Sequence, residues 1–589
     1  MKADEACGGF RFRHPKEQGH DRTGRDTCVV EFINRGEIRM RQIVSVLILM
    51  WLLFSAVLVF GEDQVQSNPP SPPSTEQAAQ PAQEAPAAPA PELKPDPSGA
   101  NTGGASDVVG ASAHAPTADD LKNLGPKEPL ATKLADVIGH NRIAINLLWT
   151  LLCGFLVFFM QAGFALVETG FTRAKNAGHT MAMNLMVFVF GVLGYWLIGF
   201  ALQMGGVGAN PLAGGTALLN GEFTMHLFGK DFGVFGTKGF FLMGQTYDAS
   251  IITLFLFQVV FMDAAATIPT GAMAERWTYK SFMIYSFFMG MIIYPLYANW
   301  VWGGGWLSQI GKNFGLGHGT LDFAGSSVVH MVGGVAALAG AWSLGPRIGK
   351  YKANGKPNAI PGHHIPMAVL GTMILAFGWF GFNAGSTLAG TDLRIGIVAV
   401  NTMLSSVAGA FSAMVYMWIF FGKPDISMSA NGMLAGLVAI TAPCAFVNPV
   451  SAAIIGTVAG VVCCASVFFV ERVLKVDDPV GAISVHGANG AWGLLSLGLF
   501  ADGTYGDGLN NTAGTVKGIF YGGGSQFSAQ IVGVATCFVF VFVLTYVFLK
   551  LTNTIVPMRV SEEVEFEGLD QSEVAVTAYP DFSLHKTHR

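Results

Sequence analysis

Charged side chains are scarce in this chain of 589 residues. Asp, Glu, Lys and Arg together make up 12% of it, whereas soluble domains carry about 25%. The formal net charge of −5 is small, and the chain offers none of the basic surface that binds nucleic acid. The composition therefore argues against an ordinary soluble domain and against a nucleic-acid-binding protein.

Motifs of common enzyme and metal sites are missing as well. The chain contains no nucleophile elbow, metal-ligand motif or phosphate loop. None of its seven cysteines forms a CxxC pair, and those in apolar runs are expected to act as small packing residues. We therefore expect no enzyme activity, no metal site and no cofactor. The cysteines in apolar runs are Cys153, Cys444, Cys463, Cys464 and Cys537.

Apolar residues are abundant instead. They make up 51% of the chain, which also contains 74 glycines that suit close packing of helices in lipid. Apolar runs of about 20 residues, the length that spans a bilayer, recur from Ala144 to Leu551. We predict an all-α membrane protein with 11 transmembrane helices. Their expected ranges are 143–167, 179–203, 246–273, 278–300, 324–345, 363–386, 393–421, 431–448, 450–472, 480–501 and 526–551.

Composition divides the chain into five parts. The second is an apolar run preceded by Arg39 and Arg41, which is typical of a signal peptide or of an uncleaved signal anchor, with Met40 as an alternative start. The third is too poor in large apolar residues to fold alone. In order, the parts are a polar N-terminal extension (1–42), the signal peptide or anchor (43–60), a disordered Pro/Ala-rich linker (61–142), the transmembrane domain (143–552) and a C-terminal tail (553–589).

Lysine and arginine set the expected orientation. The loops after the odd-numbered spans carry eleven of these residues, and the loops after the even-numbered spans carry five. Because basic loops stay in the cytoplasm, the sequence predicts that the first span begins outside and that the C-terminus is cytoplasmic. We expect a multi-pass protein of the cell's inner (plasma) membrane.

Two aspartate–histidine pairs share one spacing. Asp322 precedes His330 by eight residues, and Asp478 precedes His486 by eight. Ionisable groups inside a membrane usually face a bundle interior or a polar pathway. The histidines fall in the fifth and tenth expected spans, which predicts a 5+5 inverted repeat that brings them together at mid-depth. Two facing imidazoles can share a proton; the alternative is two unrelated histidines bonded to backbone.

The two aspartates lie near the N-terminal ends of their helices. A carboxylate at that place accepts hydrogen bonds from free backbone N–H groups. For Asp478 this structural role is favoured. For Asp322 two roles stay open: the structural one, and the attraction of a cation at the outer mouth.

Aromatic residues cluster near the outer ends of several spans. The cluster contains Phe257, Phe261, Trp302 and Phe382, with the hydroxyl of Ser386 nearby. Aromatic faces bind small cations with ~2 kcal/mol or more when both are desolvated. On composition alone, an interfacial belt or packing role is favoured, and a cation site is the alternative.

The order of several motifs gives a more specific interpretation. Over residues 143–570 the chain resembles the ammonium transporter (Amt/Mep/Rh) family. The resemblance implies an inverted-repeat bundle of 11 helices that forms homotrimers with one pore per subunit. The matching segments are AGFALVETGFTRAKN, FQVVF, GAMAERW, VWGGGW, LDFAGSSVVH, GWFGFNAGS, VDDPVGAISVHG and RVSEEVEFEGLD.

The same resemblance implies a role for each candidate residue. Ammonium would be recruited at an outer aromatic site and lose its proton, and ammonia would then pass a gate of stacked phenyl rings and a pair of histidines. The recruitment site corresponds to Phe261, Trp302 and Ser386, the phenyl gate to Phe261 and Phe382, the twin histidines to His330 and His486, and the supporting positions to Asp322, Phe257, Trp379 and Thr441.

The resemblance also implies a partner and two alternative functions. The motif RVSEEVEFEGLD, after the last span, resembles a tail that couples subunits, and it implies a PII-type signal protein at the cytoplasmic face. The alternatives to transport are an ammonium sensor with the same fold and a channel for ammonia or carbon dioxide. Trp302 argues against the gas channel, because the Rh branch tends to lack the outer tryptophan.

Three features depart from the family pattern. Glu168 and Asp263 place carboxylates within apolar spans where several family members carry neutral residues. Each is expected to be the buried partner of a nearby polar group, and an unusual ion or proton path is the alternative. The stretch KNFGLGHGT before Leu321 is expected to be an insertion that changes the outer vestibule and leaves the pore unchanged.

Overall fold

The computed structural model describes residues 94–112, 114–209, 217–510 and 512–582. The chain divides into two units, residues 1–81 and 82–589. The first unit lies outside the described residues, and so do the expected polar extension and the signal peptide or anchor. The fold described below is that of the second unit.

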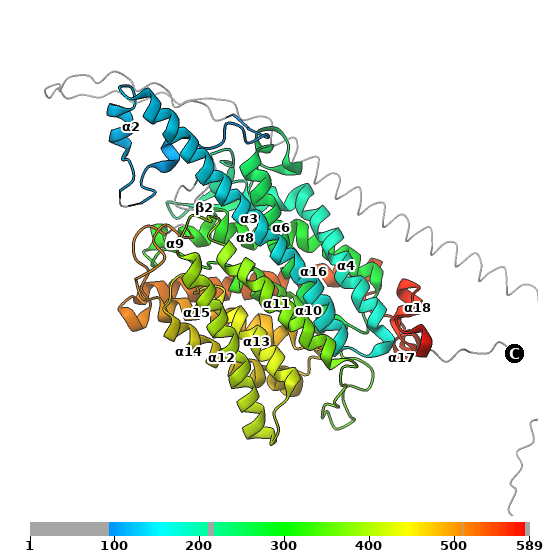
Figure 1. The fold of residues 1–589 in the computed structure, drawn as a ribbon. Helices are drawn as coiled ribbons and strands as arrows, with labels where there is room; N and C mark the ends of the chain where they lie inside the picture. The colour runs from blue at the N-terminus through cyan, green and yellow to red at the C-terminus, as the bar shows by residue number, and fades with distance from the viewer. Residues whose placement is uncertain (1–93, 113, 210–216, 511, 583–589) are drawn as a thin grey trace, which may run out of the picture. The chain divides into compact units, whose positions relative to one another are not determined.

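Helices make up most of the described residues (Figure 1). A two-stranded antiparallel hairpin, β1 (Glu222–Leu227) with β2 (Lys230–Gly236), is the sheet found in this part of the chain. The helices are α2 (Ala118–Leu124), α3 (Pro129–Phe171), α4 (Ala177–Gly194), α5 (Phe200–Met204), α6 (Ala249–Met273), α7 (Tyr279–Phe288), α8 (Tyr294–Trp302), α9 (Trp306–Phe314), α10 (Val332–Leu344), α11 (Ile365–Gly385), α12 (Ile395–Phe421), α13 (Ile426–Ile440), α14 (Pro449–Phe469), α15 (Asn489–Phe500), α16 (Gly524–Ile555), α17 (Glu562–Glu567) and α18 (Leu569–Val574).

Several long helices contain π-helical turns, in which the backbone hydrogen bond reaches one residue further than in an α-helix. Two of these turns begin helices that matter for the site. Turn η9 (Ser326–Met331) runs into α10, and turn η11 (Ile483–Ala488) runs into α15. The other π turns are η3 (Tyr195–Gly199), η8 (Met289–Ile293) and η10 (Val470–Leu474).

Nine helical segments of the described chain are long and apolar enough to cross a membrane. A mostly helical membrane fold is therefore confirmed. Helix α13 is shorter, and neither it nor η11 with α15 belongs to this set, although they occupy the eighth and tenth expected ranges. The count of 11 spans and the 5+5 repeat stay predictions.

Helix α3 starts earlier than the first expected span. It begins at Pro129, a residue whose fixed φ suits the first helical position. The backbone N–H of Ala105 donates to Asp136 on this early part of the helix, at 2.8 Å. The backbone N–H of Asp96 donates to Asp248, the residue that caps α6, at 2.9 Å. The described residues therefore differ from the disordered linker expected over 61–142.

Glycines allow η9–α10 and η11–α15 to cross at very short range. A Cβ added to Gly334 would lie well inside van der Waals contact of the backbone of Gly487. A Cβ added to Gly490 would lie 2.5 Å from the carbonyl oxygen of Ser326. Small residues permit such close approach of helices in a membrane. This crossing holds the two histidine-bearing turns against each other.

Ion pairs join the helix ends on the side of the C-terminal tail. Arg347 pairs with Glu275 at 2.9 Å and with Asp477 at 2.8 Å. Burial raises the pKa of Asp477, but the charges of Arg276 and Arg347 outweigh that effect and hold the pKa well below its usual range. Asp477 is therefore ionised at neutral pH, and its buried charge depends on these partners.

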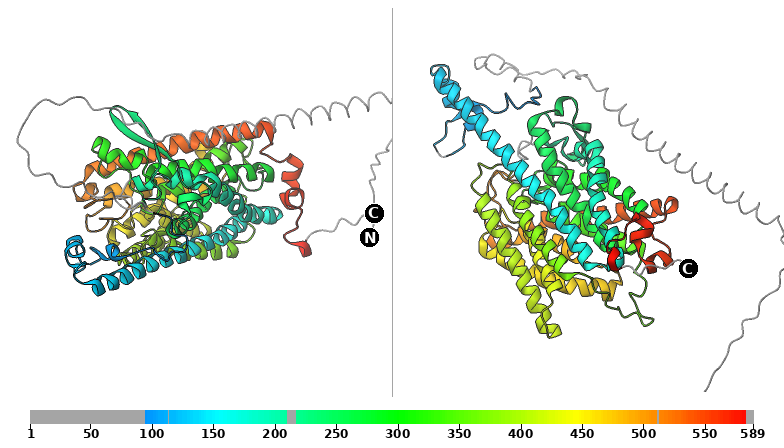
Figure 2. Two further views of the ribbon diagram at one scale, coloured as in Figure 1. Left: turned by 90° about the horizontal axis from the view of Figure 1, so that it is seen from above. Right: turned by 45° about the vertical axis from the view of Figure 1, so that its right-hand side comes forward.

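The tail is bonded to the same helix ends. Figure 2 shows α17 and α18 in red, together at one end of the bundle. The carboxylate of Glu565 accepts hydrogen bonds from Arg559 at 2.7 Å and from the backbone of Ile348 at 2.6 Å. Asp570 accepts from the backbone N–H of His179, at the start of α4, at 2.8 Å. A displacement of the tail would therefore break contacts with at least two other segments.

We expect Gly334→Ala to destabilise the protein, because the new methyl group would overlap backbone that packing holds in place. Overpacking of this kind costs about 1–3 kcal/mol. Gly396 in α12 has open space around an added Cβ, so Gly396→Ala is the matched control. Thermal unfolding of the purified protein in detergent should show a lower midpoint for Gly334→Ala alone. Equal midpoints for the two variants would contradict the close crossing.

Candidate functional site

The two histidines of the matched motifs meet inside the bundle. The Nδ1 atoms of His330 on η9 and His486 on η11 lie 3.2 Å apart, and the ring planes are inclined by 23°. His330 is fully buried and His486 is 5% exposed. A hydrogen bond between two Nδ1 atoms needs one of them to donate and the other to accept. The arrangement can therefore share a proton between two side chains that water barely reaches.

Asp322 holds the turn that carries His330. Its carboxylate accepts four backbone N–H bonds of 2.6–2.9 Å and a fifth bond from the hydroxyl of Ser327 at 2.7 Å. Both oxygens are used, and the side chain is fully buried. The geometry therefore favours the structural role over direct attraction of a cation. The backbone donors are those of Gly325, Ser326, Ser327 and Val328.

Asp478 does the same for the turn that carries His486. Its carboxylate accepts from the backbone N–H groups of Gly481 at 3.0 Å and Ile483 at 2.8 Å. In both motifs a glycine follows the aspartate by three residues and has positive φ, 113° at Gly325 and 80° at Gly481. A left-handed backbone suits glycine, so each motif needs this residue to fold its carboxylate back onto the helix start.

A column of aromatic rings ends at His330. The ring of Phe382 stacks on His330 with centroids 5.4 Å apart, and Phe261 stacks on Phe382 at 4.0 Å. Phe257 lies 4.6 Å from Phe261, and the indole of Trp302 meets the same ring edge-on at 6.1 Å. The structure therefore brings together four aromatic side chains and one histidine from four separate helical segments.

Hydrogen bonds orient the polar atoms beside this column. The indole of Trp302 donates to the carbonyl of Asp322 at 2.6 Å, so the motif that places His330 also fixes Trp302. The hydroxyl of Ser386 donates to the carbonyl of Phe382 at 2.8 Å and is only partly buried. Because that hydroxyl proton is already used, its oxygen lone pairs are the free part, and they suit a cationic donor.

Trp379 and Thr441 support His330 from the side. The indole ring stacks on the imidazole with centroids 4.9 Å apart and an angle of 19°. Its Nε1 donates to the hydroxyl of Thr441 at 2.9 Å. Both residues are fully buried. The indole therefore forms a fixed wall that limits how far His330 can turn.

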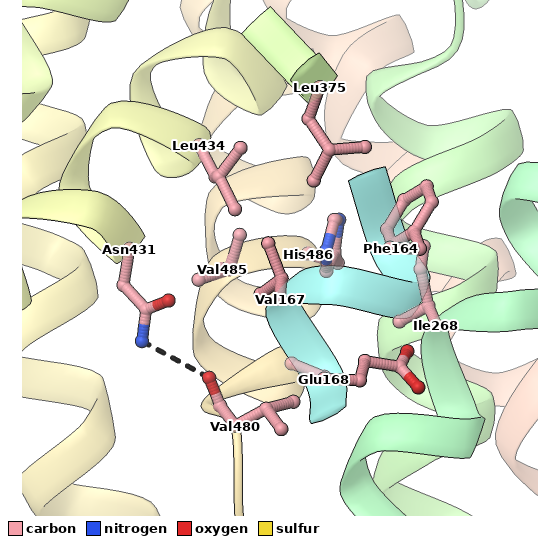
Figure 3. A pocket seen from close by; sticks show the side chains of 11 residues that line it. Phe164, Val167, Glu168, Ile268, Leu375, Asn431, Leu434, Val480, Val485 and His486 are labelled. Carbon is pink, nitrogen blue, oxygen red and sulfur yellow. Dashed lines mark hydrogen bonds between the residues drawn. The ribbon is translucent and has the colours of Figure 1, made fainter. Parts of the chain in front are cut away.

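A cavity lies against His486, the histidine that does not stack on Phe382 (Figure 3). It has room for a water-sized molecule. Sequence reasoning missed most of its lining, because apolar residues in an apolar span carry no local signal of a cavity. Phe164, whose ring lies 6.0 Å from that of His486, belongs to the family-like segment AGFALVETG, which was the only local indication of this lining. Among the lining residues are Phe164, Glu168, Leu375, Leu434, Val485 and His486.

The two carboxylates that depart from the family pattern have different surroundings. Glu168 lines the cavity and accepts hydrogen bonds from Asn184 and Thr270, each at 2.7 Å. This is the buried polar partnership expected for it. Asp263 is 2% exposed, and its Oδ1 has no hydrogen-bond partner in the structure. At least one carboxylate oxygen of Asp263 is therefore unpaired, so the expected pairing with a nearby polar group does not account for this residue.

Metal ligation is not indicated in the part of the chain described here. No group of three or more His, Cys, Asp or Glu side chains is placed to hold a metal ion among residues 94–112, 114–209, 217–510 and 512–582. A membrane bundle that aligns a column of aromatic rings with a buried histidine pair is typical of a transporter or channel, because ionisable residues inside a membrane usually mark the path of a substrate or ion.

The chain belongs to the ammonium transporter family. The model of the "Ammonium Transporter Family" matches residues 148–579. The chain is 46% identical to "Ammonium transporter Amt2" of Archaeoglobus fulgidus over 458 residues, which cover 77% of this chain and 92% of that protein. It is 37% identical to "Ammonium transporter Amt1" of Haloferax mediterranei, over 74% of this chain and 80% of the relative.

Solved structures agree with this assignment. One similar structure is that of a "Sensor Amt Protein", with a TM-score of 0.63, 35% identity and coverage of 74% of this chain and 99% of that one. Another is that of Saccharomyces cerevisiae Mep2, with a TM-score of 0.61, 26% identity and coverage of 71% and 88%. Both likenesses cover most of each chain, so they apply to the whole membrane bundle.

We expect Asp322→Asn to lower stability. The amide would turn an NH2 group toward backbone N–H donors, and leaving such buried donors unpaired costs about 1–3 kcal/mol. Asp507→Asn, at an exposed loop position, is the control. Thermal unfolding in detergent checks this. An unchanged midpoint for Asp322→Asn, combined with a weaker ammonium half-saturation, would instead support the attraction of a cation.

Proposed function

We propose that this chain is a transmembrane ammonium transporter. Ammonium is recruited at an outer aromatic site formed by Phe261, Trp302 and Ser386. It loses its proton there, and neutral ammonia passes the stacked rings of Phe261 and Phe382 and then the histidine pair. The observation that carries the proposal is the 3.2 Å contact between the imidazoles of His330 and His486 at the end of the aromatic column.

The energetics of desolvation support separate paths for the proton and for ammonia. Aromatic faces attract a cation with ~2 kcal/mol or more when it is desolvated, but burying an isolated charge in an apolar passage costs far more than this. The stacked rings of Phe261 and Phe382, between which ammonia would pass, are 0–1% exposed. Ammonia crosses such a passage at a much lower cost than ammonium.

The histidine pair provides a route for the released proton. An imidazole can hold a proton on one nitrogen and give up another from the second nitrogen. Nδ1 of His330 faces Nδ1 of His486, while Nε2 of His330 is buried and has no partner in the structure. That free nitrogen is available to a passing molecule, and the shared Nδ1 contact passes charge to the second ring.

The remaining architecture is proposed in line with the family. The chain has 11 spans in a 5+5 inverted repeat and forms homotrimers in the inner (plasma) membrane, with its C-terminus in the cytoplasm. A PII-type signal protein is the proposed partner at that face. The contacts of Glu565 and Asp570 with other segments support a tail that senses the position of the helix ends.

We rank transport above the two alternative functions. The curated relatives described above are named transporters, although one similar structure is that of a "Sensor Amt Protein". Conduction of ammonia or carbon dioxide as a gas ranks lower, because Trp302 completes an outer site that suits a cation.

Replacing either histidine should change what crosses the membrane. We expect His330→Ala and His486→Ala each to abolish selective ammonium transport or to convert it to leaky ion conduction, since the proton route is broken and the pore is widened. Ammonium and potassium pulses on a solid-supported membrane measure the currents. His226→Ala, on the exposed hairpin, is the control. Unchanged current and selectivity in both pore variants would refute the proton-relay role.

Trp302→Leu should weaken the apparent affinity. Leucine keeps the wall apolar but removes the aromatic face, so we expect a loss of about 1–2 kcal/mol in cation binding. The half-saturation concentration for methylammonium, measured by uptake into proteoliposomes, should rise by roughly 5- to 30-fold. The same half-saturation as the unmodified protein would return Trp302 to the interfacial belt.

A further inference from the structure

Glu168 faces the same cavity as His486. It lies near the end of α3, is 3% exposed, and lines the space beyond the histidine pair (Figure 3). The aromatic column lies on the opposite side of the pair, because Phe382 stacks on His330. Anything that leaves the pair through this cavity therefore passes a carboxylate.

Hydrogen bonds hold the carboxylate of Glu168 in place. Its Oε2 accepts from Asn184 on α4 and from Thr270 on α6, each at 2.7 Å. The amide of Gln161 donates to Thr267 at 2.8 Å and to the carbonyl of Asn184 at 2.6 Å, which extends the network along α3 and α6. Four side chains and one carboxylate thus form a buried polar cluster next to an otherwise apolar cavity.

Few other ionisable groups face Glu168. Two of them belong to the segment that includes η11. His486 lines the same cavity, and the charge of Asp478 acts on Glu168. Asp478 is already engaged by backbone N–H groups. From α4 and α6 the neighbours are the uncharged Asn184 and Thr270. His486 is thus the ionisable neighbour that shares the cavity with it.

In the proposed inverted repeat, the other half of the bundle carries a neutral residue at the matching place. Phe164 contacts His486 as Trp379 contacts His330. Asn383, four residues after Trp379, is uncharged, and its amide donates a hydrogen bond to Thr402 on the neighbouring α12 at 2.9 Å. Four residues after Phe164, Glu168 bonds Asn184 on the neighbouring α4. An amide is sufficient to bridge the helices, so the acid at 168 is not required by packing.

We infer that Glu168 is a second proton-binding site of the pathway, beyond the histidine pair; this inference rests on the proposed function. A protonated His486 gives its proton, through a molecule in the cavity, to the carboxylate of Glu168. The imidazole returns to its neutral form, and the carboxylate becomes a carboxylic acid. Ammonia that has passed the pair then takes this proton and leaves as ammonium, which restores the carboxylate.

Three variants separate this role from packing. Glu168→Gln keeps the size and the acceptor oxygen but removes the proton site, and Glu168→Asp keeps the acid on a shorter side chain. Asp263→Asn removes another buried carboxylate, one that does not line the cavity. Ammonium-evoked currents are recorded for all of them against pH on a solid-supported membrane, with methylammonium as a second probe. Size-exclusion chromatography confirms that each variant is folded.

We expect the current of Glu168→Gln to fall by about a hundredfold, the low end of what a lost acid–base group costs, and its pH profile to change. Glu168→Asp should keep a current with a shifted pH profile, and Asp263→Asn should behave as the unmodified protein does. Equal loss in Glu168→Gln and Glu168→Asp, or in Asp263→Asn, would overturn the inference, as would an unaltered pH profile in Glu168→Gln. If the unmodified protein gave no ammonium current, the proposed function itself would fail.

Discussion

The contact between the imidazoles of His330 and His486 is the constraint on which the rest of this structure depends. Two polar rings can meet at 3.2 Å inside a bundle only if their helices approach closely and their backbone polar groups find partners. The glycine crossing at Gly334 and Gly487 provides the approach. Asp322 and Asp478 provide the partners, since each carboxylate binds the free N–H groups at the start of one histidine-bearing helix.

The aromatic side chains depend on the same arrangement. Trp302 is oriented by the carbonyl of Asp322, and Trp379 is oriented by Thr441. Phe382 then stacks on His330 and carries Phe261 above it. In the proposed mechanism, a cation recruited at the outer end of this column next meets the stacked rings of Phe261 and Phe382. We propose that such a passage attracts ammonium at its mouth but favours the neutral molecule inside.

Much of the site was predictable from the sequence, because its residues lie in motifs with fixed local spacing. The eight-residue interval between each aspartate and histidine predicted that both histidines occupy equivalent places, and the structure brings them together. Composition alone favoured an interfacial belt for the aromatic residues, and only the resemblance to the ammonium transporter family implied that they gather at one site. The pairing of the histidines needed only short segments and the repeat of one pattern.

The cavity beyond the pair could not be predicted in this way. Its walls come from α3, α6, α11 and α13 as well as η11, and apolar residues in apolar helices give no sign of which ones meet. The early start of α3 at Pro129 was also missed, since its first turns include charged residues such as Lys133 and Asp136 and are stabilised by contacts with residues such as Ala105. Glu168 was noticed as an unusual acid, but its position beside His486 depends on packing between distant segments.

We propose that the proton and ammonia cross the membrane separately and that both reach the far side. The most direct test measures charge and substrate together in proteoliposomes that contain the unmodified protein, using a membrane current and the uptake of labelled methylammonium in the same preparation. We predict a current that rises and saturates with uptake, with a fixed charge moved per molecule taken up. Uptake without any current would contradict it, because ammonia would then be crossing without its proton.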